Sequence, residues 1–251
     1  MMKMIDNRFE NCTDKELLES IPDKSVHMVL TDPPYIISKD SGMQKHLESG
    51  NVDEKYGRKY AIATDYGDWD KEYTIENLEY SIQEFKRILV PGGSCIIFFD
   101  LWKIETLANL LKKHNFTKLR LIEWVKTNPV PINAKATYLS NAREIAISCV
   151  NGNKKSTFNS YCDNGIYSYP IYSGKDRFHP TQKSLPLFTD LVKKHTNSGD
   201  IVVDPYGGSA TTYCASKRLG RKCISCEINL EFYEKSLKRI EDDTAELFTL
   251  S

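Results

Sequence analysis

Several common signatures are missing from this sequence of 251 residues. No apolar run approaches the roughly 20 residues that a membrane-spanning helix needs, so we expect no contact with a membrane. The segment from Met1 to Asp6 reaches charged side chains too early for a secretory signal, and we therefore expect a cytoplasmic protein. Neither G-x-G-x-x-G nor G-x-x-x-x-G-K-[ST] occurs, which disfavours a nicotinamide or flavin site and gives no support to a P-loop.

The composition is that of an ordinary globular protein whose charge is unevenly distributed. The chain is 40% apolar and 27% charged with a formal net charge of zero, and its length suits one sizeable α/β core with room for an inserted lobe. Between Lys118 and Lys183, however, ten basic and only four acidic residues give a local charge of +6. A protein that contacts phosphates with one face shows this pattern, although a solvated charged surface explains it too.

The seven cysteines favour reduced thiols over disulfides, because no secretory signature accompanies them. Cys223 and Cys226 form a C-x-x-C pair, a spacing that also occurs in zinc and redox sites. The residues around them, 221–228, look like a strand, and no second Cys/His pair stands at metal-binding spacing. We therefore favour two small buried strand residues and expect no metal site.

Strand and helix patterns alternate along most of the chain. Apolar runs predict strands at 25–31, 94–99, 119–125, 145–150, 200–203 and 222–226. Amphipathic stretches predict helices at 73–89, 103–114, 185–195, 210–219 and from Leu230 onward, the first of them closed by the sequence Pro-Gly-Gly at 91–93. The alternation predicts an α/β fold, a mostly parallel doubly wound sheet with helices on both faces.

Two stretches lack this regularity. Residues 36–70 are polar and contain several glycines, and we expect a long mobile loop there. Residues 126–177 are rich in Asn, Gly, Pro and Tyr, and apart from the strand-like run at 145–150 we expect an irregular lobe attached to the sheet.

The segment 201–212, IVVDPYGGSATT, predicts a strand that enters a glycine-containing turn and then a helix. Glycines let a ligand approach the backbone, and a helix N-terminus offers unpaired N–H groups to its polar end. Glu227 stands about twenty residues further on, at the tip of the next predicted strand, where a carboxylate can accept hydrogen bonds from both ribose hydroxyls. The spacing fits an adenosine-type cofactor, although an ordinary strand–helix turn with Glu227 as a solvated cap fits the same residues.

A rigid acidic elbow, Asp32-Pro33-Pro34-Tyr35, follows the first of the predicted strands. Two prolines supply no N–H donors, so the carbonyls of this elbow face outward without a local partner. A carboxylate and an outward carbonyl are two acceptors, which suits an exocyclic amino group with two donors. Tyr35 adds a flat face on which a base can stack, worth about 1–3 kcal/mol. A simple loop turn is the alternative interpretation of these four residues.

Together these motifs resemble those of the DNA adenine-N6/cytosine-N4 amino-methyltransferases. Residues 32–35 resemble the family's catalytic motif and 204–212 its cofactor motif, although Tyr206 stands where Phe is usual and Ala210 where Gly is usual. The segment 179–184, HPTQKS, resembles a family segment that ends in Lys-Pro. The order of the motifs, with the catalytic motif first, matches the β group, and the resemblance covers nearly the whole chain as one methyltransferase domain, 1–251.

The resemblance implies the doubly wound, Rossmann-like methyltransferase sheet with one antiparallel strand, the run at 145–150, and it implies a role for each motif. The target base would be flipped out of the duplex, because its amino group is inaccessible in the stack. The implied catalytic residues are Asp32, Pro33, Pro34 and Tyr35, of which Asp32 and the Pro33 carbonyl would hold the amino group and Tyr35 would stack on the ring. The implied methyl donor is S-adenosylmethionine, with no metal. The residues implied in its binding are Asn11, Cys12, Asp32, Thr181, Gln182, Lys183, Asp204, Pro205, Tyr206, Gly208, Ser209, Ala210, Thr211, Glu227 and Ile228.

Within this set the resemblance places Glu227 at the ribose and residues 181–183 near the methionine carboxylate. Asn11 and Cys12 match a position where the family often has an Asp near the adenine, and that Asp is absent here. Double-stranded DNA is the implied partner, with 126–177 as a target-recognition insert. A homodimer and a cognate restriction enzyme are further partners that rest on the resemblance alone.

The expected activity is site-specific methylation of adenine N6 in DNA. Asp32 favours adenine, because cytosine-N4 members of the family more often have Ser at that position. Cytosine-N4 methylation, methylation of RNA or of a protein amide, and a non-catalytic DNA-binding module with a vestigial pocket remain the alternatives.

Overall fold

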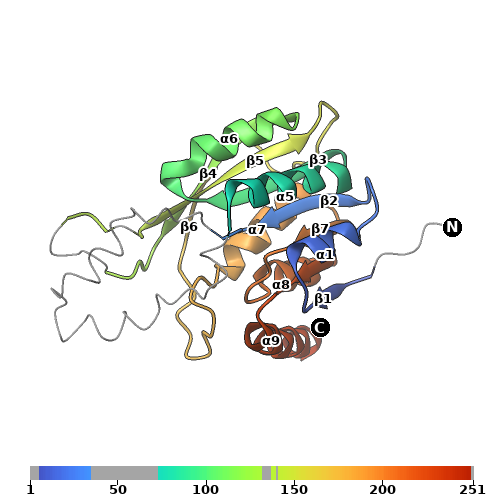
Figure 1. Ribbon diagram of the computed structural model, residues 1–251. Coiled ribbons are helices and arrows are strands. Elements are labelled where there is room, and N and C mark those ends of the chain that lie inside the picture. The colour runs from blue at the N-terminus through green and yellow to red at the C-terminus, as the bar shows by residue number, and fades with distance from the viewer. Residues whose placement is uncertain (1–5, 35–72, 132–136, 140, 250–251) are drawn as a thin grey trace.

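The structure is a computed structural model, and residues 6–34, 73–131, 137–139 and 141–249 of it are described (Figure 1). In these residues eight strands form one sheet in the order β1-β8-β7-β2-β3-β5-β4-β6. The strands are β1 (Arg8–Glu10), β2 (Val26–Thr31), β3 (Leu89–Phe99), β4 (Phe116–Lys126), β5 (Arg143–Asn151), β6 (Ile166–Tyr169), β7 (Ile201–Asp204) and β8 (Lys222–Cys226). The helices are α1 (Asp14–Glu19), α5 (Ile75–Ile88), α6 (Ile104–Lys113), α7 (Leu185–His195), α8 (Thr211–Arg218) and α9 (Leu230–Thr249), with a short 3-10 turn, η1 (Leu101–Lys103).

The sheet is mostly parallel, as predicted. Neighbours from β1 to β3 pair in parallel, and so do β4 and β6. Of the described strands β5 alone runs against its neighbours, pairing antiparallel with β3 on one side and with β4 on the other. The predicted strand at 145–150 is therefore confirmed, and the α/β fold with one antiparallel strand is confirmed with it.

Helices cover both faces of the sheet, because the side chains of its central strands alternate between two apolar clusters. On β2, Val29 belongs to the cluster that includes Leu78 of α5, whereas Met28 and Leu30 belong to the cluster that includes Phe188 of α7. All five side chains are at most 2% exposed. The central strands are thus buried on both faces, which explains why their sequences are continuous apolar runs.

The sequence prediction differs from the structure at the end of the helix predicted for 73–89. Helix α5 ends at Ile88 and β3 begins at Leu89, so the Pro-Gly-Gly sequence at 91–93 lies inside a strand instead of closing the helix. Gly92 has a φ of 93°, and a Cβ atom there would overlap the carbonyl oxygen of Lys155. Strand pairing and this close backbone approach therefore override the turn signal of the three residues.

The stretch 126–177 is more regular than the sequence indicates. It contributes β5 to the interior of the sheet and β6 to its edge. Helix α1, which follows a capping box between Thr13 and Glu16, was also not predicted. The expected mobile loop at 36–70 lies outside the described residues. No helix in the described part of the chain is long and apolar enough to cross a membrane.

Candidate active site at the carboxyl edge of the sheet

Three carboxylates predicted from the sequence meet at one edge of the sheet. Asp32 directly follows β2, Asp204 is the last residue of β7, and Glu227 directly follows β8. These strands are parallel neighbours in the order β8-β7-β2, so their carboxyl ends coincide. This edge is where α/β sheets bind their ligands.

Asp32 is held by a lysine from a distant segment. Its Oδ2 atom lies 2.7 Å from Nζ of Lys183, and the two side chains are 17% and 9% exposed. The residue before it, Thr31, is fully buried and donates a hydrogen bond of 2.7 Å to Oδ1 of Asp204. The structure thus joins the expected catalytic aspartate to the segment 179–184. Tyr35, the expected stacking residue, lies outside the described residues.

Lys183 belongs to a row of alternating charges that the sequence did not predict. Its Nζ atom also lies 2.6 Å from Oε2 of Glu144 at the start of β5, and Oε1 of Glu144 lies 2.6 Å from Nζ of Lys126 at the end of β4. Burial favours a raised pKa for Glu144, but the two ammonium groups outweigh it and lower its pKa to about 2. Burial likewise favours a lowered pKa for Lys183, and the carboxylates of Asp32 and Glu144 outweigh it and raise this pKa.

Asp204 is a structural anchor of the turn after β7. Its two carboxylate oxygens accept hydrogen bonds from Thr31, from the backbone N–H of Tyr206 at 3.1 Å and from Thr212 at 2.5 Å. Burial raises the pKa of Asp204 to about 6 although the threonine hydroxyls act to lower it. Since all these donors come from the protein itself, Asp204 fixes the shape of the turn at residues 205–210.

The turn itself approaches its neighbours closely. A Cβ atom on Gly207 would overlap Oγ of Ser225 in β8, and Gly208, at a φ of 49°, packs against the ring of His179. Helix α9 holds the same turn from outside: Ser236 donates a hydrogen bond of 2.7 Å to the carbonyl oxygen of Gly208. Arg239 of α9 also donates to the carbonyl oxygen of Ser209 at 2.6 Å and to the hydroxyl of Thr211 at 3.0 Å. The backbone of the turn is therefore fixed on both sides.

The remaining residues of the turn are buried. Pro205 is buried, and Ala210 is 1% exposed at the N-terminus of α8 with a left-handed φ of 61°. That conformation suits the glycine that the family usually has at this position.

The hydroxyl group of Tyr206, a residue that stands where the family usually has Phe, makes hydrogen bonds to neighbouring helices. The hydroxyl donates a hydrogen bond of 2.7 Å to Oδ2 of Asp14 in α1 and lies 2.8 Å from Oγ of Ser81 in α5. It also lies 2.9 Å from the hydroxyl of Tyr73, whose ring stands edge-on to its own. The extra oxygen therefore ties the turn to two helices on the same face of the sheet.

Glu227 is 8% exposed, and burial raises its pKa to about 7. Its Oε1 atom accepts a hydrogen bond of 2.8 Å from the backbone N–H of Asn229. Asn11 donates from its amide to the carbonyl oxygens of Glu227 and Ile228 at 2.8 and 3.1 Å, which fixes the chain at the end of β8. Cys12 packs partly buried against the core, and Ile228 is 54% exposed.

The segment 179–184 packs across the turn. His179 lies against Phe232 of α9 with ring centroids 4.5 Å apart, and burial followed by the charge of Lys183 lowers its pKa to about 4. Gln182 is 5% exposed, and its Oε1 atom is buried without a hydrogen-bond partner among the described residues. Thr181 is exposed. The ammonium of Lys183 contacts Asp32 and Glu144, so a contact of Lys183 with a methionine carboxylate remains a prediction.

These features fit a nucleoside with an amino-acid tail. A buried carboxyl at Glu227 can accept hydrogen bonds from hydroxyl groups, and a buried amide oxygen at Gln182 can accept one from an ammonium group. Between them lies a turn whose glycines leave no room for side chains. Because the acceptors and the close-approach backbone occur together, the residues suit the cofactor that the sequence predicts.

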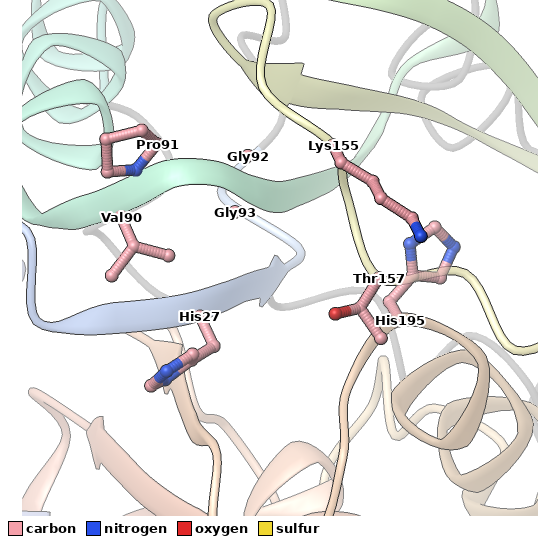
Figure 2. Close-up of a pocket in the computed structure, with 8 residues that line it drawn as sticks. All are labelled: His27, Val90, Pro91, Gly92, Gly93, Lys155, Thr157 and His195. Atoms are coloured by element: carbon pink, nitrogen blue, oxygen red, sulfur yellow. The ribbon is translucent and has the colours of Figure 1, made fainter.

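A separate pocket of about 170 Å³ lies at the opposite edge of the sheet (Figure 2). It is lined by His27 at the start of β2, by residues 90–93 of β3 and by Lys155, Thr157 and His195. Since Asp32 follows the other end of β2, the length of this strand separates the pocket from the edge where Asp32, Asp204 and Glu227 meet. None of the predicted site residues lines it.

The comparisons with known proteins agree with this geometry. The family model described as "DNA methylase" matches residues 26–238. The type II methyltransferase M2.MboI of Moraxella bovis is 29% identical, over 93% of this chain and 86% of its own. M2.DpnII of Streptococcus pneumoniae is 28% identical, over 90% and 86%.

Among solved structures, that of an M1.HpyAVI–SAM complex is similar with a TM-score of 0.67 and 26% identity, over 93% of this chain and 98% of that one. Because the family model spans both the acidic elbow and the glycine turn, the protein belongs to the DNA methylase family.

Proposed function

We propose that this protein transfers a methyl group from S-adenosylmethionine to the N6 amino group of adenine in double-stranded DNA. The observation that carries the proposal is the position of Asp32, beside a buried ammonium and on the same sheet edge as the Glu227 carboxyl and the glycine turn. The solved M1.HpyAVI structure carries SAM, and the curated relatives are named type II methyltransferases. When bound, the cofactor supplies an electrophilic methyl group.

The protein's own residues would position the amino group. The Lys183 ammonium favours an ionised Asp32, because an opposite charge at 2.7 Å stabilises the carboxylate. An ionised Asp32 accepts a hydrogen bond from the exocyclic amino group and can take the proton that this nitrogen must lose. The Pro33 carbonyl is the second acceptor, and Pro34 keeps the elbow rigid. Positioning of this kind contributes most of the rate in a direct displacement.

At the cofactor, Glu227 would accept hydrogen bonds from the ribose and Gln182 would face the amino-acid tail. The preference for adenine rests on Asp at position 32 instead of the Ser that is more frequent in cytosine-N4 members. Residues 126–177 would contact the DNA as a target-recognition insert. A homodimer and a cognate restriction enzyme remain predictions.

The test is methyl transfer from labelled S-adenosylmethionine to duplex DNA, followed by digestion to nucleosides. We expect N6-methyladenine in the wild-type reaction and a loss of at least about 100-fold in kcat for Asp32→Ala, with cofactor affinity changed only modestly. The matched control is Asp23→Ala, which removes an aspartate whose side chain is 69% exposed.

Other outcomes would overturn parts of the proposal. N4-methylcytosine as the sole product would refute the choice of base. Transfer to RNA or protein but not to DNA would refute the substrate class, and cofactor binding without any turnover would indicate a non-catalytic module.

A further inference from the structure

Glu144 and Lys126 are linked to the proposed catalytic aspartate, Asp32, through Lys183. Both lie on the part of the sheet formed by β4 and β5, while Asp32 and Lys183 come from the end of β2 and the segment before α7. The Glu144 carboxylate uses one oxygen for each lysine, at 2.6 Å in both cases. Its side chain is 20% exposed, and those of Lys126 and Lys183 are 10% and 9% exposed. Ion pairs this sheltered are screened much less by salt than surface pairs.

The Lys183 ammonium is therefore shared between two carboxylates at nearly equal distances, 2.7 Å to Asp32 and 2.6 Å to Glu144. A cation held by a single carboxylate would concentrate its attraction on that group and reduce its strength as a hydrogen-bond acceptor. When the Lys183 ammonium contacts both Asp32 and Glu144, its attraction is divided between the two carboxylates. Lys126 in turn draws on Glu144 from its other side, so each charge in the row moderates its neighbour.

We propose that Glu144, braced by Lys126, is a positioning residue that divides the Lys183 ammonium between itself and Asp32, and so keeps Asp32 a strong acceptor for the amino group being methylated. This inference rests on the proposed function of Asp32. The ion pairs run from Lys126 to Glu144, from Glu144 to Lys183 and from Lys183 to Asp32, so Glu144 and Lys126 would act on Asp32 through Lys183.

Other charged groups near the row do not replace this arrangement. Asp204 is close enough to Asp32 to feel its charge, but its own oxygens accept from Thr31, Thr212 and a backbone N–H. His179 lies near Lys183, and its pKa is lowered to about 4, so it is neutral near pH 7. The centroid of the uncharged Phe98 ring lies 5.6 Å from Nζ of Lys183. Glu144 is thus the second anionic partner of Lys183 among the described residues.

Because the charges of Lys126, Glu144, Lys183 and Asp32 alternate in sign, removing Glu144 and removing Lys126 should change the ionisation of Asp32 in opposite directions. Glu144→Gln removes a negative charge near Asp32 and leaves Lys183 to Asp32 alone, so the pH at which activity is lost on the acid side should move down. Lys126→Met keeps the stem of the side chain but removes a positive charge, and Glu144 then draws Lys183 away from Asp32. The acid limb should move up. We expect shifts of about one pH unit in these opposite directions.

The experiment is the pH profile of single-turnover methyl transfer to duplex DNA at S-adenosylmethionine concentrations that saturate the protein at every pH, with cofactor affinity measured on the same preparations. The matched control is Glu123→Gln, which removes a carboxylate from β4 that pairs with the exposed Arg143 at 3.3 Å. Its profile should coincide with that of the wild type.

A purely structural role for Glu144 and Lys126 would lower the rate at all pH values without moving the acid limb. Coincidence of the Lys126→Met profile with the wild-type profile, or shifts of both variants in the same direction, would overturn the inference. Failure of the proposed function is a separate result, because Asp32→Ala would then retain activity whatever the two profiles show.

Discussion

If Glu227 takes the ribose, as proposed, the affinity for the cofactor should depend on pH. Burial raises its pKa to about 7 in the protein without ligand. Ribose hydroxyls donate hydrogen bonds and therefore favour the ionised carboxylate. The cofactor should therefore bind the ionised form, and the population of that form falls about tenfold for each pH unit below 7. We expect the Kd for S-adenosylmethionine to be roughly ten times weaker at pH 6 than at pH 8, and roughly a hundred times weaker at pH 5.

The assay is calorimetric titration of the protein with S-adenosylmethionine between pH 5 and 8, run in parallel on Glu227→Gln. The variant should bind more weakly than the wild type at pH 8 and lose this part of the pH dependence. Titration of the cofactor itself is common to both proteins, as is that of Asp204, so the ratio of the two Kd values isolates Glu227. A ratio that stays constant from pH 6 to 8 would refute the assignment of the ribose to this carboxyl.

Glu227 also makes the folding free energy depend on pH, but here the folded protein without ligand favours the protonated carboxyl, whereas cofactor binding should favour the ionised one. The pKa of Glu227 is higher in the folded protein, about 7, than its ordinary value of 4.5, so the folded state binds this proton more tightly than the unfolded chain does. Ionised Glu227 therefore costs folding free energy above pH 7, on the order of 3 kcal/mol, and this cost disappears as the pH falls from 7 to below 4.5. In urea unfolding without ligand, Glu227→Gln should be more stable at pH 8 by up to that amount and gain nothing at pH 4.

Two substitutions test the residues that hold the turn at 205–210, and a third on the opposite edge of the sheet is their control. Tyr206→Phe leaves the Asp14 carboxylate without its 2.7 Å hydrogen bond, and we expect a loss of about 1–3 kcal/mol in urea unfolding together with weaker cofactor binding in the calorimeter; unchanged values for both would contradict the role given to the hydroxyl. Gly207→Ala places a Cβ atom onto Oγ of Ser225, so cofactor affinity should fall at least tenfold even where the protein still folds. Gly92→Ala, at a φ of 93° on the opposite edge, should lower the unfolding free energy but leave the Kd for the cofactor unchanged, and a changed Kd would show that the two edges are coupled.

Much of the fold could be predicted from the sequence, because its elements carry strong local patterns. The helix at 185–195 and the strand at 222–226 have the predicted bounds, since one shows a clear amphipathic period and the other a short apolar run. The predicted bounds were wrong where a tertiary contact determines the end of an element, as at the start of β3. Gly92 adopts its strand position because it packs against the backbone at Lys155, which no local pattern reveals.

The site was predictable to the extent that it follows strand ends. Asp32, Asp204 and Glu227 each close a strand pattern, and parallel neighbours bring such ends together. Glu144 and Lys126 have no such signal, because their role depends on β5 pairing beside β4 and on Lys183 reaching them from a segment 39 residues later than Glu144. The one hint in the sequence was that Glu144 is an acid inside the most basic stretch of the chain. The net charge of a segment, however, does not show which lysine a carboxylate contacts.

The three carboxylates at the sheet edge show why burial alone does not identify a functional acid. All three are largely removed from water, and each ionised form needs compensation. Asp204 obtains it from hydroxyl and N–H donors of the protein, which suits a group that shapes a turn. Asp32 obtains it from a lysine shared with Glu144, which suits a group that must be ionised before its substrate arrives.

Glu227 receives mainly backbone N–H donors, and its raised pKa shows that these do not offset its burial. Of the three groups it is therefore the one whose compensation is incomplete in the protein alone. A ligand with two hydroxyl groups would supply what is missing, and the unfavourable burial of this acid would then become a preference for that ligand. The pH dependence of cofactor binding would measure this preference directly, since a fully compensated Glu227 would titrate far below pH 7 and leave the Kd flat.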